Sequence, residues 1–410
     1  MISQRGTPVT SHRPCPVCHL QTARYLHTMH FALADTSPLP ALYDVLVCQR
    51  CGSGYADSAT GVDAYDEYYR DFSKYEDTAV ATGGGDEPMD RQRLADLAAF
   101  LAARIAPGAR VLDVGCGNGG LMAALRKRGF NDLTGFDPAA ACIARIKAQG
   151  MSAYQVSLPL TDPVAIAQHW GTFDLIVLSH VLEHVFDAQA VLASLLPLLA
   201  TNGRLYIETP DPARYATEGF PPLYFFDPEH INHLGAESLE SLGTVLGLEP
   251  IVIAPKSLAL ANGNLYPAVF GLFESRGVPG ATLLDRGLGL YQPLLAYVDQ
   301  GLADLAPMRA RIMSLIGNDR PFALWGAGSL SQRLIGEPWF PAHQLRAVVD
   351  RDHKKHGLRF SGLIITSPET GLRDLPETTL ILCAAAIATQ AIKQDYLALQ
   401  LPYPFHAIVN

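Results

Sequence analysis

The stretch Arg110-Val-Leu-Asp-Val-Gly-Cys-Gly-Asn-Gly-Gly-Leu121 decides the fold of this chain of 410 residues. Its apolar run, Val111 to Val114, predicts a buried strand, and the closely spaced glycines that follow predict a tight turn into a helix. Glycine leaves the backbone bare where a ligand must come close. A second expected strand, 133–136, ends at Asp137. An acid at this place binds the hydroxyls of a nucleoside ribose.

The glycine turn alone is weak evidence, because such turns also serve NAD sites and ordinary packing. Asp113 favours another ligand, since a carboxylate repels a pyrophosphate and attracts a cationic amino-acid group. The D-x-G-x-G turn, Asp137 and the stretch Ser179-His-Val-Leu-Glu-His184 together resemble class I S-adenosylmethionine (SAM) dependent methyltransferases. This resemblance implies a SAM site in which Asp113 meets the amino group and Asp137 the ribose. The residues expected at the cofactor are Tyr75, Asp113, Gly115, Cys116, Gly117, Asp137 and Ser179.

Composition limits the classes of protein to consider. The net charge of -9 argues against a general nucleic-acid binder, which would present a basic face. No apolar run reaches the ~18 residues of a membrane span, and the first residues lack a signal-peptide core. Seven cysteines, four of them in two CxxC pairs, indicate reduced thiols and metal rather than a secreted disulfide framework. We therefore expect a cytoplasmic protein without membrane or nucleic-acid partners.

The two CxxC pairs predict a zinc site in an N-terminal zinc ribbon. Cys15, Cys18, Cys48 and Cys51 would supply the four thiolates of a tetrahedral structural zinc, which leaves no position for substrate water. The long intervening loop is expected to carry a hairpin, with residues 42–47 as one strand. The alternative is a pair of redox-active CxxC motifs, but no βαβ pattern surrounds them.

After Cys51 the stretch Tyr65-Asp-Glu-Tyr-Tyr-Arg-Asp-Phe-Ser-Lys-Tyr75 is rich in tyrosine and precedes Gly83-Gly-Gly85. These tyrosines are either surface packing or an arm that folds over the SAM pocket, with the glycines as a hinge.

From residue 91 to 255 helical patterns alternate with short apolar strands, of which 173–178 and 203–208 are the clearest. This alternation predicts a doubly wound parallel sheet with its ligand at the carboxyl ends of the strands. His184 follows the strand 173–178 at that edge and is a candidate base or hydrogen-bond donor, although a histidine there also serves packing. His180 is a weaker candidate.

A second polar cluster, Phe226-Asp-Pro-Glu-His-Ile-Asn-His233, follows the strand that ends in Glu208. Asp227, Glu229 and His230 crowd three acid/base groups into one loop, which suggests a site. The alternative is that Glu229 and His230 only tie this loop to the sheet.

The C-terminal part predicts a third, Rossmann-like α/β domain. A helical pattern spans about residues 283–316, with Pro293 and Pro307 expected to kink or divide it. A βαβ pattern follows, in which Gly326 and Gly328 form half of a phosphate fingerprint and Asp350 takes the place of an NAD ribose acid. Ser331 replaces the third glycine. We interpret this domain as one that closes the substrate site, with NAD binding as the alternative.

The expected limits are residues 1–62 for the zinc domain, 63–255 for the SAM domain with its arm, and 256–410 for the C-terminal domain. This order is similar to the three-domain sugar C-methyltransferases of deoxysugar biosynthesis, from Cys15 to about Ile408. The resemblance implies a nucleotide-linked keto-sugar substrate, a base-generated enolate that attacks the SAM methyl, and active-site roles for His184, Glu229 and His230. It places Tyr75 near an arm tyrosine.

Two positions depart from that family. Asp227 stands where the family has a tyrosine base. The stretch Asn262-Gly-Asn-Leu-Tyr266 is similar to a strand of the family, and Tyr266 stands where that strand has an arginine. O-methylation of a sugar or other small metabolite needs no enolate-stabilising group and is therefore the first alternative. A zinc-ribbon RNA methyltransferase is disfavoured by the acidic balance. A non-catalytic protein that binds SAM or a sugar nucleotide is the alternative from another class.

Overall fold

The computed structural model describes residues 4–72, 88–217, 219–260, 263–275, 280–281, 283, 285–385 and 388–408. The chain divides into two compact units. The first comprises Met1–Leu26, Val45–Tyr215 and Glu229–Leu294, and the second comprises His27–Asp44, Ala216–Pro228 and Leu295–Asn410.

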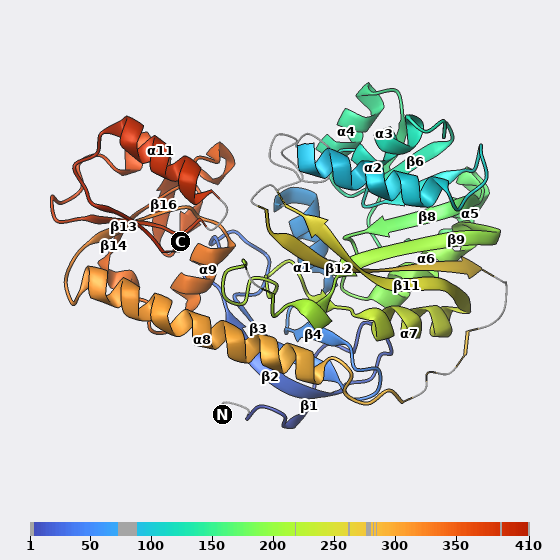
Figure 1. Ribbon diagram of the computed structural model, residues 1–410, viewed down its shortest axis with the longest axis horizontal. Helices are drawn as coiled ribbons and strands as arrows, with labels where there is room; N and C mark the ends of the chain where they lie inside the picture. The colour runs from blue at the N-terminus through green and yellow to red at the C-terminus, as the bar shows by residue number, and fades with distance from the viewer. Residues whose placement is uncertain are drawn as a thin grey trace. The chain divides into compact units, whose positions relative to one another are not determined.

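Strands and helices alternate along most of the described chain (Figure 1). The strands are β1 (Pro8–Thr10), β2 (Thr22–His30), β3 (Leu42–Cys48), β4 (Gly54–Asp57), β5 (Val111–Val114), β6 (Leu133–Asp137), β7 (Ser152–Gln155), β8 (Phe173–Ser179), β9 (Leu199–Pro210), β10 (Asn232–His233), β11 (Leu248–Ala259), β12 (Leu265–Ser275), β13 (Phe322–Trp325), β14 (Leu345–Val349), β15 (Arg359–Phe360), β16 (Leu363–Thr366), β17 (Leu380–Cys383) and β18 (Phe405–Ala407). The α-helices are α1 (Val62–Glu67), α2 (Pro88–Ala102), α3 (Gly120–Arg126), α4 (Ala140–Ala148), α5 (Pro163–Trp170), α6 (Ala188–Leu195), α7 (Ala236–Leu246), α8 (Tyr291–Ile316), α9 (Ser329–Gly336), α10 (Pro368–Gly371) and α11 (Thr389–Leu399).

The first unit is built on a seven-stranded sheet with the order β11-β12-β9-β8-β5-β6-β7. β5 pairs in parallel with both β6 and β8, and β8 pairs in parallel with β9. Among the described strands of this sheet, β12 runs antiparallel to both of its neighbours, β9 and β11. The carboxyl ends of β5, β6, β8 and β9 therefore meet at one edge, where an α/β sheet of this kind binds its ligand.

Both faces of this sheet are buried, as a parallel sheet requires. Successive strand residues point to opposite faces, so Leu175 and Val177 of β8 pack with α2, α3 and α4, whereas Ile176 and Leu178 pack with α6 and α7. Figure 1 shows the two groups of helices on opposite sides of the sheet. The expected doubly wound α/β fold is confirmed.

The cysteine pairs lie beside a five-stranded sheet with the order β1-β2-β3-β4-β10. Its last strand, β10, comes from a distant part of the chain and pairs antiparallel with β4, with Asn232 opposite Tyr55 and His233 opposite Gly54. The hairpin strand expected at residues 42–47 is present as β3.

The second unit contains a six-stranded sheet with the order β15-β16-β14-β13-β17-β18. β13 pairs in parallel with β14 and with β17, and α9 connects β13 to β14, so the expected second βαβ unit is present. Buried side chains of β13 and β17 fill the core on both faces, as in a Rossmann-like layer arrangement.

Two expectations differ from the structure. The sheet of the first unit continues past residue 255 through β11 and β12, so the predicted boundary between 255 and 256 falls inside β11. The helix expected over 283–316 begins only at Tyr291, and Pro307 lies inside a single helix, α8, rather than dividing it. Within the described residues, no helix combines the length and the apolar character that crossing a membrane requires.

Candidate active site

The glycine turn after β5 is held against β6 by its own backbone. Gly115 N and Cys116 N both donate to the carbonyl of Phe136, at 2.7 and 3.1 Å. Gly115 has φ +69°, and a Cβ there would lie 2.5 Å from Cγ2 of Val181. Glycine is therefore required both by the left-handed conformation and by the close approach of the segment that follows β8.

Asp137 closes this turn from the end of β6. Its buried carboxylate accepts hydrogen bonds from Gly117 N at 2.8 Å and from Ala139 N at 2.9 Å. The residue predicted to meet the ribose thus also fixes the loop that is predicted to line the cofactor.

Asp113 lies within β5 and is buried. Burial raises the pKa of its carboxyl, the nearby charge of Asp137 raises it further, and Arg93 opposes them, which together place it at about 7. Because the ionised form of this carboxyl is destabilised, a cation beside it would stabilise that form. The amino group expected there is such a cation.

Cys116 and Ser179 lie at the predicted edge of the sheet, and their side chains contact other parts of the protein. Cys116 is buried, and its Sγ would lie 2.7 Å from a Cβ placed on Gly135, so the thiol packs against β6. Ser179 Oγ donates to Glu208 Oε1 at 3.3 Å. Any contact of Cys116 with a cofactor would come from its backbone.

His180 and Glu208 form a buried ionic cluster at the ends of β8 and β9. His180 has φ +57° and places Nδ1 2.9 Å from Glu183 Oε1 and Nε2 3.3 Å from Glu208 Oε1. Lys256 Nζ lies 2.7 Å from Glu208 Oε2, and Tyr206 donates its hydroxyl to the same oxygen at 2.5 Å. The fully buried Glu208 thus has cationic and neutral donors around it.

These neighbours set the ionisation of the cluster. Burial alone would lower the pKa of His180, but its hydrogen bonds to Glu183 and Glu208 and their charges raise it to about 9. Burial alone would raise the pKa of Glu208, but His180 and Lys256 hold it well below its usual range. The cluster is therefore ionised at neutral pH.

The predicted catalytic residues His184, Glu229 and His230 lie together, beside two tyrosines. The imidazole rings of His184 and His230 have centroids 4.7 Å apart. Tyr69 Oη lies 2.7 Å from His184 Nδ1, and Tyr68 donates to Glu229 Oε1 at 2.7 Å. Both tyrosines belong to a short π-helix, Tyr68–Phe72.

Backbone hydrogen bonds join the two segments that carry these side chains. Ile231 N and Asn232 N donate to the carbonyl of Glu183 at 2.8 and 3.1 Å. Asn232 Nδ2 donates to the carbonyls of Leu182 and Val185, both at 2.7 Å. The candidate site is therefore assembled from the loop after β8 and the residues that precede β10.

Buried Arg13 adds a third segment to this assembly. Its guanidinium donates to the carbonyls of Phe186, Ala56 and Ile231 and to the amide oxygen of Asn232. The N-terminal segment that carries the first cysteine pair is thus fixed directly to both parts of the site.

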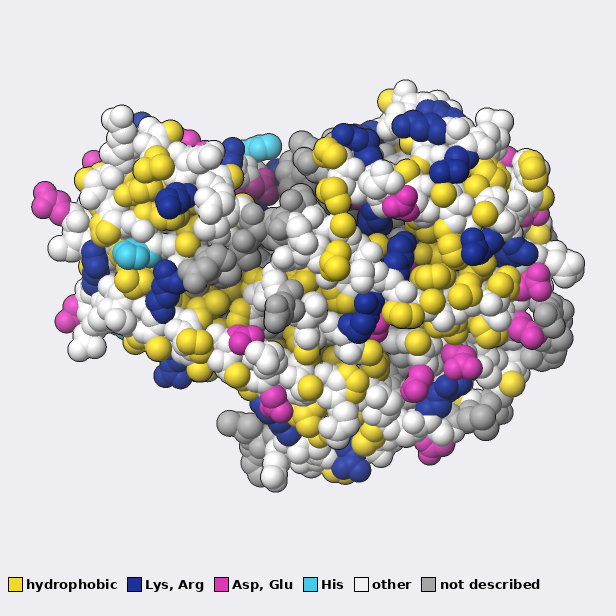
Figure 2. Space-filling view, in the orientation of Figure 1, with side chains coloured by type: hydrophobic (Ala, Val, Ile, Leu, Met, Phe, Trp, Pro, Cys, Tyr) yellow, Lys and Arg dark blue, Asp and Glu magenta, His cyan; other side chains and the backbone are white. Residues whose placement is uncertain are grey.

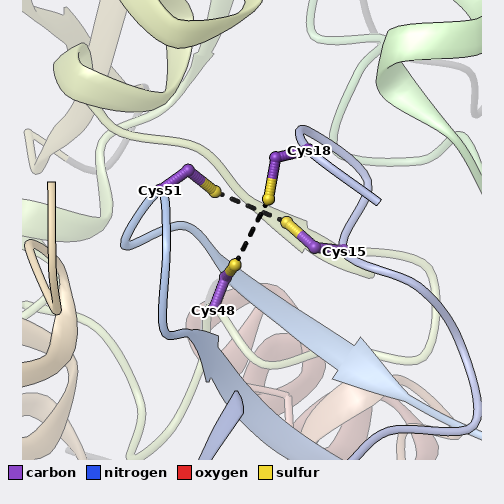
Figure 3. Close-up of side chains that lie close together, drawn as sticks. All are labelled: Cys15, Cys18, Cys48 and Cys51. Atoms are coloured by element: carbon purple, nitrogen blue, oxygen red, sulfur yellow. Dashed lines mark hydrogen bonds between the residues drawn. The ribbon is translucent and has the colours of Figure 1, made fainter. Parts of the chain in front are cut away.

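The four cysteines converge on one point (Figure 3). Cys15 Sγ lies 3.5 Å from Cys51 Sγ, and Cys18 Sγ lies 3.4 Å from Cys48 Sγ. Disulfide sulfurs would be ~2 Å apart, whereas thiolates around zinc with bonds of ~2.3 Å are separated by roughly 3.8 Å. Arg50 N, which lies 3.4 Å from Cys48 Sγ, gives this sulfur a backbone donor. The geometry and the donor set fit a structural zinc ion.

In the second unit, Asp350 follows β14 at the place expected for a ribose acid. Its carboxylate accepts from Ala327 N at 2.7 Å and from Asp352 N at 2.9 Å, and it lies 3.0 Å from Lys355 Nζ. Ser331 is fully buried and donates to the carbonyl of Gly326. Asp350 fixes its glycine turn as Asp137 does, but a lysine also engages it, so NAD binding gains no support from these contacts.

Sequence reasoning missed several residues at the site. Glu208, Lys256 and Arg13 carried no motif, and Glu183 stood in the quoted stretch 179–184 without an assigned role; these residues find their partners only through folding. Tyr68 and Tyr69 belong to the tyrosine-rich stretch, whose density was the available signal, but the residue chosen from it, Tyr75, lies outside the described residues.

Residues 88–252 match the family described as a methyltransferase domain. The ubiquinone biosynthesis O-methyltransferase of Xanthomonas campestris pv. campestris (strain B100) is 37% identical over 114 residues, which cover 27% of this chain and 47% of the relative. The enzyme of the same name from Psychrobacter arcticus is 38% identical over 109 residues, with 25% and 41% covered. The chain thus spans about half the length of the curated relatives it matches.

Two solved structures are similar to part of the chain. The magnesium protoporphyrin IX methyltransferase of Synechocystis PCC 6803 with bound SAM is 15% identical with a TM-score of 0.36, covering 51% of this chain and 94% of that one. An N-methyltransferase of Bradyrhizobium japonicum WM9 in complex with S-adenosyl-L-homocysteine is 16% identical with a TM-score of 0.37, covering 49% and 94%. These scores are too low to support an inference about this chain.

Proposed function

We propose, from the premise that residues 88–252 form a class I SAM-dependent methyltransferase domain, that this protein transfers the methyl group of SAM to a small polar acceptor. The observation that carries the proposal is the grouping of His184, Glu229 and His230 where the segment after β8 contacts the glycine turn through Val181. We favour a carbon of a nucleotide-linked keto-sugar as the acceptor, methylated through a base-generated enolate.

Bound SAM would supply an electrophilic methyl group to the acceptor. Asp113 would attract its amino group and Asp137 its ribose, and the backbone of residues 115–117 would line its path. Gly115, Cys116, Gly117 and Ser179 remain proposed cofactor residues on this basis. Methyl transfer is an in-line displacement, so its rate depends chiefly on the alignment of the acceptor atom behind the methyl group.

We assign His230 as the base or its proton partner, with Glu229 orienting the site and His184 polarising an acceptor oxygen. The ring of His184 has two neighbours at Nδ1: the carbonyl of Glu229 at 3.1 Å and the hydroxyl of Tyr69 at 2.7 Å. The hydroxyls of Tyr68 and Tyr69 provide phenols near this network, although Asp227 replaces the family's tyrosine base.

O-methylation is the second candidate, and two observations favour it. The curated relatives are named O-methyltransferases, and one base suffices to remove a hydroxyl proton without stabilising an enolate. The tyrosine missing at Asp227 counts against the enolate route, and together with the arginine missing at Tyr266 it also counts against a sugar-nucleotide acceptor. A sugar hydroxyl or another small polar metabolite would be the acceptor in this case.

An RNA acceptor has less support. The net charge is -9, and Figure 2 shows Lys and Arg interspersed with Asp and Glu on the face that it draws. RNA binding by charge needs a concentrated basic surface.

For the four cysteines we propose zinc with a structural role, since a closed thiolate shell has no open position for chemistry.

The experiment is mass spectrometry of the full chain incubated with labelled SAM and nucleotide-linked sugars, each ketone paired with its reduced alcohol. Methylation of the ketones alone, with solvent deuterium exchange at the adjacent carbon, is the result expected for C-methylation. Methylation of the alcohols would show O-methylation. If the chain binds SAM but methylates none of these compounds, either the acceptor is not a nucleotide-linked sugar or the protein is not a catalyst.

The site assignment is tested by the double substitution Glu229→Ala/His230→Ala. We expect SAM affinity within about threefold of wild type and loss of at least 10²-fold in turnover, since general base catalysis contributes about that much. The control is Glu377→Ala/His169→Ala, which changes the same residue types at exposed positions. Turnover that survives in the first variant would show that these residues are not catalytic.

A further inference from the structure

We propose that Glu183, His184 and His230 bind a divalent metal ion, separate from the zinc of the four cysteines. One carboxylate oxygen of Glu183 and one ring nitrogen of each histidine all lie within 4.8 Å of one another. Ligands on a metal with bonds of ~2.1 Å lie roughly 3 to 4 Å apart, so small side-chain rotations close the site.

The ring of His184 is oriented by neighbours at Nδ1. The Glu229 carbonyl lies 3.1 Å from Nδ1 and can accept a hydrogen bond when that nitrogen carries the proton. Tyr69 Oη, 2.7 Å from Nδ1, is a second group in the same network and lies 3.3 Å from the same carbonyl. Histidines that bind metals almost always donate their other ring N–H to a carbonyl, carboxylate or water, and this defines the ligating tautomer.

Glu183 provides the second, independent observation. Its side chain is only 1% exposed. Oε1 lies 2.9 Å from His180 Nδ1, but Oε2 is buried and has no hydrogen-bond donor among the described residues. A buried carboxylate oxygen without a donor is costly, and a cation beside it removes that cost.

The ligands are held by segments that are joined to each other. The carbonyl of Glu183 accepts from Ile231 N and Asn232 N, which follow His230 directly. The side chain of Asn232 spans the carbonyls of Leu182 and Val185 on either side of Glu183 and His184. Metal sites need this kind of support, because ligand placement within about 0.5 Å decides affinity.

The ligand set selects the class of ion. Two imidazoles and one carboxylate suit Mn²⁺, Fe²⁺, Co²⁺ or Zn²⁺ better than Mg²⁺ or Ca²⁺, which prefer oxygen alone. His184 and His230 are half-buried. Bound between them, the ion would act as a Lewis acid for an acceptor oxygen, and the two histidines would then serve as its ligands in place of direct roles as base and polarising group. This role rests on the proposed function, whereas the binding of the ion does not.

The test uses the full chain loaded with zinc and then titrated with Mn²⁺, monitored by electron paramagnetic resonance. Mn²⁺ is chosen because the four thiolates prefer zinc, so the second site alone should take it. We expect one Mn²⁺ per chain and, by electron spin echo, coupling to imidazole nitrogen. Failure of the wild-type chain to bind Mn²⁺ at millimolar concentration, or binding without nitrogen coupling, would overturn the proposal.

Variants identify the ligands. Glu183→Gln and His230→Gln should each weaken Mn²⁺ binding at least tenfold, whereas His169→Gln, at an exposed histidine of α5, should leave it unchanged. Circular dichroism and thermal unfolding of each variant show that the chain is folded. Unchanged Mn²⁺ affinity in folded Glu183→Gln and His230→Gln would contradict the assignment. Mn²⁺ binding without any methyl transfer would leave the site standing and reject the proposed function.

Discussion

Asp113 and Asp137 end or nearly end two adjacent parallel strands, and their charges oppose each other inside the protein. Burial and the charge of Asp137 place the pKa of Asp113 at about 7, against an ordinary value of 3.8. A raised folded-state pKa means that Asp113 favours folding at low pH and that this contribution is lost as the pH rises from about 4 through 7. A buried carboxylate that destabilises the ligand-free protein in this way is typical of a site that binds a cation.

We therefore predict that Asp113→Asn is more stable than the wild type above pH 7 and equally stable below about pH 4. A pKa shift of about three units corresponds to at most roughly 4 kcal/mol, or several degrees in Tm. Thermal unfolding of the SAM-free proteins across this pH range measures the difference. A variant less stable than the wild type at pH 8 would contradict the prediction.

The same carboxyl predicts a pH dependence for SAM binding. If its anion meets the amino group, the wild type should bind SAM about tenfold more weakly at pH 6 than at pH 8, because most Asp113 is protonated at pH 6. Asp113→Asn should lose affinity at pH 8 and show no such slope, and exposed Asp96→Asn serves as the control. Isothermal titration calorimetry with SAM at both pH values measures this. A slope that persists in Asp113→Asn would assign it to another group.

At the scale of elements, Glu208 connects β9 to β11 and to the loop after β8. Its fully buried carboxylate lies 2.7 Å from Lys256 Nζ of β11 and 3.3 Å from His180 Nε2 of the loop. Removing one member of a buried ionic group leaves the others uncompensated, which typically costs 3–5 kcal/mol, roughly estimated. The raised pKa of His180 means that its contribution is complete below pH 6.5 and is lost as the pH rises through about 9.

We predict that Glu208→Gln lowers the free energy of unfolding by about 3 kcal/mol at pH 7 and lowers the pKa of His180. Urea unfolding and an NMR titration of the imidazole measure the two effects. The matched control is Glu240→Gln, whose carboxylate pairs with Arg286 at 2.9 Å while remaining 45% exposed, and should cost less than about 1 kcal/mol. Equal costs for the two substitutions would reject a special role for the buried cluster.

At the scale of the molecule, the paired strands β4 and β10 of the first unit join the cysteine cluster to the candidate active site. β4 follows the second cysteine pair, and β10 follows His230 by one residue, and the two strands pair antiparallel. Arg13, two residues before Cys15, donates to the carbonyls of Phe186 and Ile231 in the two segments of the same site. The segment that carries the cysteine cluster is thus joined to the residues around His230.

We predict that Cys48→Ser loses zinc, lowers the thermal stability of the chain and lowers turnover, because residues 229–233 lose the support of β4. Zinc content by mass spectrometry and amide hydrogen exchange at β4 and β10 measure these effects. Cys383→Ser, at a buried cysteine of β17, is the control and should retain zinc. Retention of amide protection at β10 after zinc loss would show that the cluster does not support the site.

Structural features that depend on a few neighbouring residues could be predicted from the sequence. The turn at 115–119 needs glycines, structural zinc needs closely spaced thiolates, and a buried parallel strand needs an apolar run, so each leaves a local pattern. The alternation of strands and helices likewise predicted the α/β fold, which the structure confirms. His184, Glu229 and His230 were predicted because polar clusters at strand ends are conspicuous.

Only the tertiary structure brought together residues that no local pattern joins. Glu183 meets His230 across 47 positions of sequence, and Glu208 meets Lys256 across 48, through strand pairing and loop packing. β11 and β12 joined the first sheet rather than a separate domain, because β12 pairs along β9. Local spacing determines which elements form, whereas burial and the requirement that buried charges find partners decide which distant residues meet.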